Sequence, residues 1–155
     1  MKYITLVAFL ALLISCDSSR VYEENKDFDQ PFWVKAFVPE FTFNIEEPTD
    51  AYNILINVRN GFEYPFYNLY YEYDLRDSLG NTLKQDMLEL ILFDQKTGEP
   101  LGSGLGDLFD HQKPVLEKYQ FPYQGEYTIA FTHFMRLDTL PLVLSVGARV
   151  ERAVD

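Results

Sequence analysis

Residues 67–77, YNLYYEYDLRD, alternate between apolar and polar side chains with a period of two. The apolar face would consist of Tyr67, Leu69, Tyr71, Tyr73 and Leu75. The opposite face is polar except for Tyr70, which we therefore expect to be exposed or interfacial. Alternation over this length is typical of a β-strand with one buried and one solvated face, so the segment predicts such a strand.

The same pattern extends over most of the chain. Alternation recurs in residues 51–59, 127–132 and 142–151, and residues 87–93 are apolar on both faces apart from Glu89. Weaker strands are expected at 33–37, 41–45 and 115–121, with glycine-containing hairpin loops at 77–81 and 94–99. This spacing predicts an all-β fold, an antiparallel, jelly-roll-like β-sandwich of about seven to nine strands. The predicted core comprises Tyr52, Ile54, Ile56, Val58, Tyr71, Leu90, Leu92, Ile129, Phe131, Leu144 and Val146.

The first sixteen residues predict secretion and lipidation. A basic start precedes an apolar run over 4–14, which is too short for a membrane span of about 20 residues. The run ends in Leu13-Ile14-Ser15-Cys16, which resembles the lipobox of bacterial lipoproteins, and Cys16 is the only cysteine. That resemblance implies that a signal peptide of residues 1–15 is removed and that the Cys16 thiol is diacylated. Two or more acyl chains anchor a protein stably without spanning the membrane.

The remaining chain divides into a short tether and one domain. Residues 16–30 are polar and predict a tether that leads into a first strand near Val21 and Tyr22, and residues 31–155 predict a single β-sandwich. In enteric bacteria an Asp in the place of Asp17 tends to retain a lipoprotein at the inner membrane, but other phyla sort differently. We predict a lipid-anchored protein of the bacterial cell envelope, on the periplasmic side of the outer membrane.

Composition excludes several classes of partner. The chain has 13 basic and 24 acidic residues and a formal net charge of −11, which makes nucleic acid an unsuitable partner. The single cysteine excludes an internal disulfide and a multi-cysteine metal site. Phe, Tyr and Trp together make up 16% of the chain, which argues against disorder.

No residue pattern predicts catalysis or a cofactor. The two histidines, His111 in a predicted DHQ loop and His133 on an apolar strand, lack the partners of a zinc site. The glycines of residues 102–107 predict a structural loop with positive φ angles, because the ending of a phosphate-binding P-loop is missing. A calcium site at Asp107 and Asp110 is conceivable, but a solvated acidic face is the preferred interpretation. A hydrolase would need a carboxylate pair, and the spacing singles out none.

Several strings, in their order and spacing, resemble the gliding-motility lipoprotein H (GldH) family of the Bacteroidetes. They are Tyr52-Asn53 with Asn57-Val58-Arg59-Asn60, Tyr64-Pro65-Phe66 with Asn68-Leu69, Asp86 with Leu88-Glu89, Leu101-Gly102 with Gly104-Leu105-Gly106-Asp107, Met135-Arg136 with Leu140, and Val146-Gly147 with Arg149-Val150-Glu151. The chain departs from that pattern at Met87, His133 and Phe134. The resemblance implies a non-enzymatic envelope component of gliding motility and type IX secretion, without a cofactor.

Seven residues are candidates for a partner surface or for internal tethers, because unpaired charged or amide groups are costly in a core. They are Arg59, Asn60, Asn68, Tyr70, Asp107, Arg136 and Arg149. An internal pairing of arginine with aspartate, such as Asp107, is slightly preferred to a partner contact. The alternative function is a carbohydrate-binding lipoprotein of jelly-roll type, in which exposed aromatics such as Tyr70 would contact the sugar.

Overall fold

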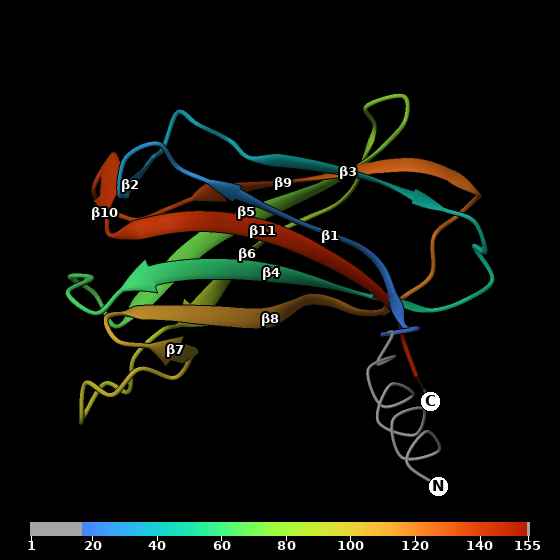
Figure 1. Cartoon of the computed structure of the whole chain (residues 1–155). Coiled ribbons are helices and arrows are strands. Elements are labelled where there is room, and N and C mark those ends of the chain that lie inside the picture. The colour runs from blue at the N-terminus through green and yellow to red at the C-terminus, as the bar shows by residue number, and fades with distance from the viewer. Residues whose placement is uncertain (1–16, 155) are drawn as a thin grey trace, which may run out of the picture.

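Two antiparallel sheets stack face to face in the computed structural model, which describes residues 17–154 (Figure 1). The five-stranded sheet consists, in spatial order, of β1 (Arg20–Asp27), β11 (Val143–Arg152), β4 (Tyr52–Gly61), β8 (Leu108–Tyr119) and β7 (Ser103–Leu105). The four-stranded sheet consists of β3 (Glu40–Ile45), β9 (Gly125–His133), β5 (Asn68–Asp77) and β6 (Thr82–Ile91). A separate pair, β10 (Thr139–Pro141) and β2 (Phe32–Val34), closes one end of the sandwich.

The all-β sandwich predicted from alternation is confirmed. Residues 17–154 contain eleven strands and no helix, so the strand count exceeds the predicted seven to nine. The excess over nine comes from β7 and β10, which have three residues each and are too short for an alternating pattern, whereas β2 overlaps the weak strand expected at 33–37. In the same range no helix is long and apolar enough to cross a bilayer.

The core lies between the two sheets, where the alternation predicted it. On β5, Leu69, Tyr71, Tyr73 and Leu75 are buried, and Tyr70 is exposed as expected. Tyr67 was expected on the buried face but is 37% exposed, because it precedes the first residue of β5. Its carbonyl oxygen instead accepts hydrogen bonds from the backbone N–H groups of residues 92 and 93.

The prediction that Leu144 belongs to the core is wrong. Leu144 is only half-buried, whereas all the other predicted core residues are buried. The register between β11 and β4 shifts between Val143 and Ser145, which indicates a β-bulge. The bulge changes the phase of the alternation, so Val143 takes the buried position in place of Leu144.

Both predicted hairpin loops are present. Asp77 accepts hydrogen bonds from the backbone N–H groups of Leu79 and Asn81, and Gly80 has a φ of 81°. Asp94 caps the second loop in the same way, and Gly98 there has a φ of 73°. Glycine adopts such left-handed conformations without the steric cost that a Cβ atom imposes.

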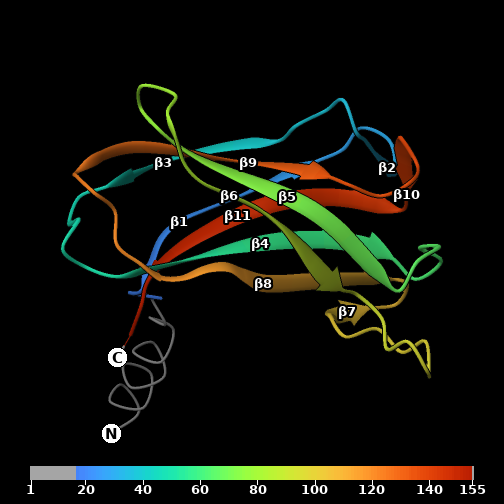
Figure 2. The ribbon, with the colours of Figure 1, turned by 180° about the vertical axis from the view of Figure 1, so that it is seen from behind.

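The start of β1 and the end of β11 lie together at one end of the sandwich (Figures 1 and 2). The strand expected near Val21 and Tyr22 is β1, which pairs with β11 over most of its length. Only three described residues, 17–19, precede it. The predicted signal peptide and Cys16 lie outside the described residues.

Candidate functional site

A row of amide side chains crosses the outer face of the five-stranded sheet. Asn25, Gly147, Asn57 and Gln112 are in register on β1, β11, β4 and β8. The Asn57 amide donates to Asn25 Oδ1 at 3.1 Å, and the Gln112 amide donates to Asn57 Oδ1 at 2.9 Å. Asn57 can reach Asn25 because Gly147, between them, has no side chain. A Cβ atom at Gly147 would lie 1.9 Å from Asn25 Oδ1 and 2.6 Å from the Glu24 carbonyl oxygen.

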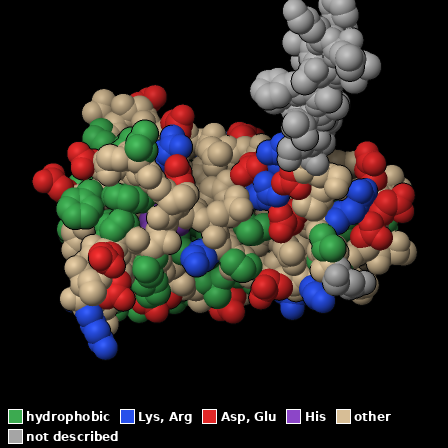
Figure 3. Space-filling view, turned by 60° about the horizontal axis from the view of Figure 1, so that its bottom comes forward, with side chains coloured by type: hydrophobic (Ala, Val, Ile, Leu, Met, Phe, Trp, Pro, Cys, Tyr) green, Lys and Arg blue, Asp and Glu red, His purple; other side chains and the backbone are tan. Residues whose placement is uncertain are grey.

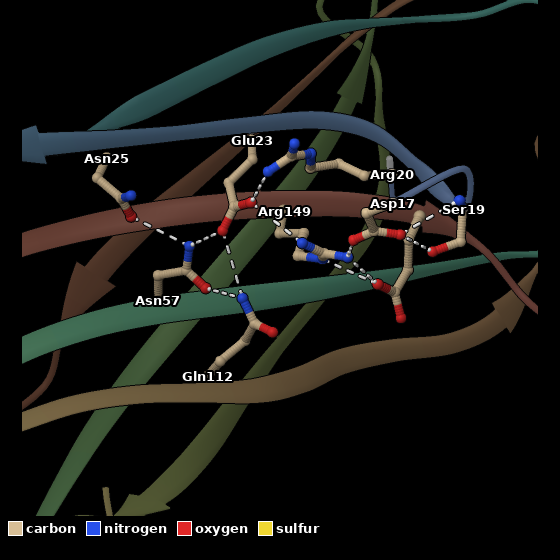
Figure 4. Close-up of polar contacts among 9 residues, drawn as sticks. Asp17, Ser19, Arg20, Glu23, Asn25, Asn57, Gln112 and Arg149 are labelled. Carbon is tan, nitrogen blue, oxygen red and sulfur yellow. Dashed lines mark hydrogen bonds and ion pairs between the residues drawn. The ribbon is translucent and has the colours of Figure 1, made fainter. Parts of the chain in front are cut away.

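A charged cluster lies next to this row, toward the start of β1 (Figure 4). Glu23 faces Arg149 across β1 and β11, and their side chains pair at 3.1 Å. Arg149 also pairs with Glu151 at 2.8 Å and with Asp17. Glu23 in turn accepts a hydrogen bond from Asn57 at 3.0 Å, which joins the cluster to the amide row.

The ion pairs and hydrogen bonds within this cluster lower the pKa values of two of its carboxylates, Asp17 and Glu23. Hydrogen bonds from Arg149 and Ser19 lower the pKa of Asp17 to about 2. Burial alone would raise the pKa of Glu23, but hydrogen bonds from Arg20 and Asn57 and the charge of Arg149 lower it. The Arg149 side chain is only 13% exposed, and within residues 17–154 its guanidinium pairs with carboxylates of this protein.

On the other side of the amide row, a further row of cross-strand neighbours contains Arg59, one of the predicted residues. Arg59 faces Ser145 on one side and Asp110 on the other. Its guanidinium binds Asp110 through two hydrogen bonds, Nε to Oδ1 at 2.7 Å and Nη2 to Oδ2 at 3.1 Å. The partner is therefore Asp110 and not Asp107, because Asp110 lies directly opposite Arg59 in the register.

A hollow of about 470 Å³ lies over these rows. It is lined by Glu23, Asn25, Asp27, Asn57, Val58, Arg59, Ser103, Asp110, His111, Gln112 and Ser145. The lining has carboxylate, amide and hydroxyl groups but no Phe, Tyr or Trp ring on which a sugar could stack. Both oxygens of Asp110 are engaged by Arg59, and residues 17–154 contain no group of three or more His, Cys, Asp or Glu that could hold a metal ion.

Three further predicted residues, Asn60, Asn68 and Asp107, make local contacts within the domain. Asn60 is fully buried and donates to the Gly61 carbonyl oxygen at 2.9 Å. Asn68 donates to Glu89 at 2.6 Å and its carbonyl oxygen accepts from the Tyr64 hydroxyl at 3.0 Å. Asp107 is exposed, and its backbone carbonyl oxygen accepts from the Phe62 N–H at 2.8 Å.

The glycine cluster of residues 102–107 is structural, as predicted, but for a partly different reason. Only Gly106 has a positive φ, of 67°. A Cβ atom at Gly102 would lie 2.5 Å from the Asp110 carbonyl oxygen and 2.8 Å from the His111 ring, and one at Gly104 would lie 2.5 Å from the Phe109 ring and closer still to the Leu108 carbonyl oxygen. The close approach of this backbone and of these rings, rather than φ, requires glycine at both positions.

The two histidines are buried strand residues. His111 was expected in a loop but lies in β8 and is 3% exposed, and burial lowers its pKa to about 4. His133 is fully buried in β9 and contacts Trp33 edge-on, with ring centroids 5.1 Å apart.

A second exposed region contains Tyr70 and Arg136, and we define the contact surface as Tyr70, Phe134, Arg136 and Leu137. The Phe134 N–H donates to the Tyr70 carbonyl oxygen at 2.8 Å, and the Tyr70 N–H lies 3.3 Å from the sulfur of the buried Met135. Tyr70, Phe134 and Leu137 are each 41–43% exposed. Arg136 is exposed and has no ion pair or side-chain hydrogen bond within residues 17–154.

Sequence reasoning missed much of the polar sheet face. It did not single out Asp17, Glu23, Asn25, Asp110 or Gln112 as partners. The usable signal was the polar phase of each alternating strand, since those residues share the solvated face of a sheet. Their pairing depends on strand order and register, which the alternation alone does not define.

Comparison with known proteins identifies the family. The family model for GldH lipoprotein matches residues 20–150. A gliding motility lipoprotein GldH homolog from Christiangramia forsetii is 28% identical, over 93% of this chain and 91% of that protein. The gliding motility lipoprotein GldH of Flavobacterium johnsoniae is also 28% identical, over 91% of this chain and 90% of that protein.

Solved structures add little to this relationship. The infectious bursal disease virus VP2 subviral particle aligns with a TM-score of 0.42 and 15% identity, over 88% of this chain and 34% of that chain. That likeness is too low to support an argument.

The family model covers 131 residues, 20 to 150, and apart from Glu151 this range contains all the sequence strings that resemble the family. The chain therefore belongs to the GldH lipoprotein family of gliding motility.

Proposed function

We propose that this protein is a lipid-anchored, non-enzymatic component of the gliding motility and type IX secretion apparatus that acts through protein contacts. Its family membership supports a lipid-anchored position in the cell envelope and a role in gliding motility. The lipobox supports removal of residues 1–15 and acylation of Cys16. We place the anchored domain on the periplasmic side of the outer membrane.

The proposed contact with a partner protein rests on one observation, the side chain of Arg136, which is exposed and unpaired among the described residues. Arg136 belongs to one of the strings that resemble the family, yet nothing within residues 17–154 pairs with it. The buried Met135 fixes the backbone beside it, and exposed Phe134 and Leu137 flank the pair. Aromatic residues and arginine are enriched among the residues that dominate protein–protein binding.

The other two candidate arginines show the opposite behaviour. Arg59 pairs with Asp110 on the neighbouring strand β8, and Arg149 pairs with Glu23 on the neighbouring strand β1 and with Glu151 on its own strand, so both arginines are engaged within the five-stranded sheet. Arg136 lacks such a role within residues 17–154, and a guanidinium there presents its donors to carboxylate or carbonyl groups of another protein.

The test replaces Arg136 in the cells that carry the protein. Arg136→Ala should abolish or strongly reduce gliding and leave the melting temperature of the purified protein unchanged. The matched control is Arg152→Ala, which removes another exposed arginine, paired with Asp50 at 3.3 Å at the opposite end of the sandwich. Unchanged gliding in Arg136→Ala would remove Arg136 from the contact surface, and a lowered melting temperature would make it a structural residue.

The carbohydrate-binding alternative has a separate test. The hollow over the polar rows lacks a Phe, Tyr or Trp ring, so Tyr70 is the exposed aromatic on which this alternative depends. A glycan array with the purified protein should show no saturable binding. Saturable sugar binding that is lost in Tyr70→Ala would favour the alternative over the protein-contact proposal.

A further inference from the structure

The three described residues that precede β1 are fastened to the sheet. Asp17 Oδ1 accepts hydrogen bonds from the Ser19 hydroxyl at 2.7 Å and the Ser19 N–H at 3.3 Å. Asp17 Oδ2 binds the Arg149 guanidinium on β11. The Ser19 carbonyl oxygen accepts from the Arg152 N–H at 2.8 Å. The chain is therefore held from Asp17 onward, and not only from the start of β1 (Figure 4).

Arg149 is well suited to hold Asp17 in place. Its side chain is 13% exposed and is itself positioned by Glu23 and Glu151. Hydrogen bonds from Arg149 and Ser19 lower the pKa of Asp17 to about 2, so this carboxylate is charged at neutral pH. Solvent and salt screen the attraction between a partly buried arginine and its carboxylates less than they screen the attraction within an exposed ion pair.

This contact limits how far the domain can move from an anchor at Cys16. Consecutive Cα atoms are about 3.8 Å apart, so the proposed lipidated residue lies one such step from Asp17. If Asp17 were released, the chain from the held Ser19 back to residue 16 would span at most about 11 Å. The fifteen-residue tether predicted from the sequence would instead allow about 50 Å.

We propose that the Asp17–Arg149 pair orients the domain on the bilayer, an inference that rests on the proposed anchoring at Cys16. The end that bears the start of β1 and the end of β11 then faces the lipid headgroups. The connection between β3 and β4 lies at the same end, because the Ala153 N–H donates to the Ala51 carbonyl oxygen and Arg152 pairs with Asp50. The connections at residues 61–67 and 92–102 lie at the opposite end and point away from the bilayer (Figures 1 and 2).

The distribution of side chains agrees with this orientation. Figure 3 shows charged side chains of both signs near the start of β1, and a larger share of apolar side chains, interspersed with charged ones, at the opposite end. The opposite end includes Phe62, Leu101 and Leu105, which are 53%, 53% and 93% exposed. Charged side chains at the headgroup level remain hydrated, whereas exposed apolar side chains held away from the bilayer are accessible to proteins.

The orientation can be measured on the lipidated full-length protein in vesicles of phosphatidylethanolamine and phosphatidylglycerol with a trace of headgroup-labelled lipid. Acylation consumes the only thiol of the chain, so an introduced cysteine is labelled at a single position. Glu47→Cys places a fluorophore at the proposed membrane end, and Lys96→Cys places one in the 94–99 loop at the other end. Energy transfer to the labelled headgroups should be several-fold more efficient from position 47 than from position 96.

Two variants test the pair itself. Asp17→Asn and Arg149→Gln should reduce the difference between the two labelled positions by more than half. Arg152→Gln is the matched control, because its side chain lies at the same end but pairs with Asp50 rather than Asp17, and it should preserve the difference. Asp17 precedes the first strand, so Asp17→Asn keeps the test valid if Arg149→Gln fails to fold.

The outcomes separate this inference from the proposed function. Equal energy transfer from both positions of the wild-type protein would overturn the orientation. A difference that survives both Asp17→Asn and Arg149→Gln would overturn the proposal that the Asp17–Arg149 pair sets it. A protein that does not float with the vesicles at all would overturn the anchoring at Cys16, and the orientation with it.

Discussion

At the scale of single residues, the buried histidine of β8 couples stability to pH. Burial against Gly102 lowers the pKa of His111 to about 4, below its ordinary value of 6.5. The folded state therefore favours the neutral imidazole. Its contribution to stability is complete above pH 6.5 and is lost as the pH falls from 6.5 toward 4.

We expect His111→Leu to lose less stability on acidification than the wild-type protein. One pKa unit corresponds to about 1.4 kcal/mol, so removing the His111 titration should spare up to about 2 kcal/mol between pH 6.5 and 5. Urea unfolding at pH 7.5 and 5 measures the difference. His133, whose pKa burial also lowers, remains in both proteins. An equal acid sensitivity of the two proteins would show that His111 is not the titrating group.

Gly147 gives a second prediction at this scale. A Cβ atom there would collide with Asn25 and with the backbone of Glu24, so strand β1 would have to shift. Gly147→Ala should cost about 1–3 kcal/mol of unfolding free energy, as overpacked sites do. Gly61→Ala is the matched control, because the nearest atom to its Cβ would be at an ordinary 3.5 Å. Thermal melts of both variants measure this, and equal stability would contradict the close packing of β1 on β11.

At the scale of strands, the alternation in the sequence predicted which residues face the core but not where the phase changes. Tyr71, Tyr73 and Leu75 are buried as their spacing indicated. Leu144 is not, because a β-bulge depends on the partner strand and leaves no signal in a local period-two pattern. The partner of Arg59 likewise depends on the register of β4 with β8, which brings Asp110 opposite it and leaves Asp107 in the turn.

The bulge predicts a difference between two core substitutions. Ile56→Ala on β4 should cost about 2–5 kcal/mol, because its side chain is fully buried and a cavity would remain. Leu144→Ala should cost clearly less, since this residue is half-buried at the edge of the bulge. Chemical denaturation compares the two directly. A larger loss for Leu144→Ala would mean that the strand keeps its phase through Val143–Ser145.

At the scale of the whole molecule, the protein is a sandwich whose ends differ. One end bears the start of β1, next to the proposed lipid, and the contact surface belongs to β5 and to the β9–β10 connection. The sequence predicted the exposed Tyr70 and the candidate Arg136. It could not predict that Arg59 and Arg149 are paired while Arg136 is free of partners within residues 17–154, because those pairings join residues far apart in the chain.

The anchor has its own prediction. Cys16→Ala removes the only thiol that could receive the lipid, so the protein should accumulate as uncleaved precursor or lose its attachment to the membrane. Metabolic labelling with palmitate measures acylation, and the wild-type protein is the control. Label that still enters the Cys16→Ala protein would contradict the assignment of the lipidation site.

The most direct test of the central claim, that the protein acts through protein contacts, is site-specific photocrosslinking in gliding cells. A photoreactive residue at Leu137 should crosslink to a defined envelope protein needed for gliding, and Arg136→Ala should abolish that product. The control position is Leu79, which is 83% exposed in the 77–81 turn and should give no such product. The account would be contradicted if position 137 gave no more product than position 79 while the cells continued to glide.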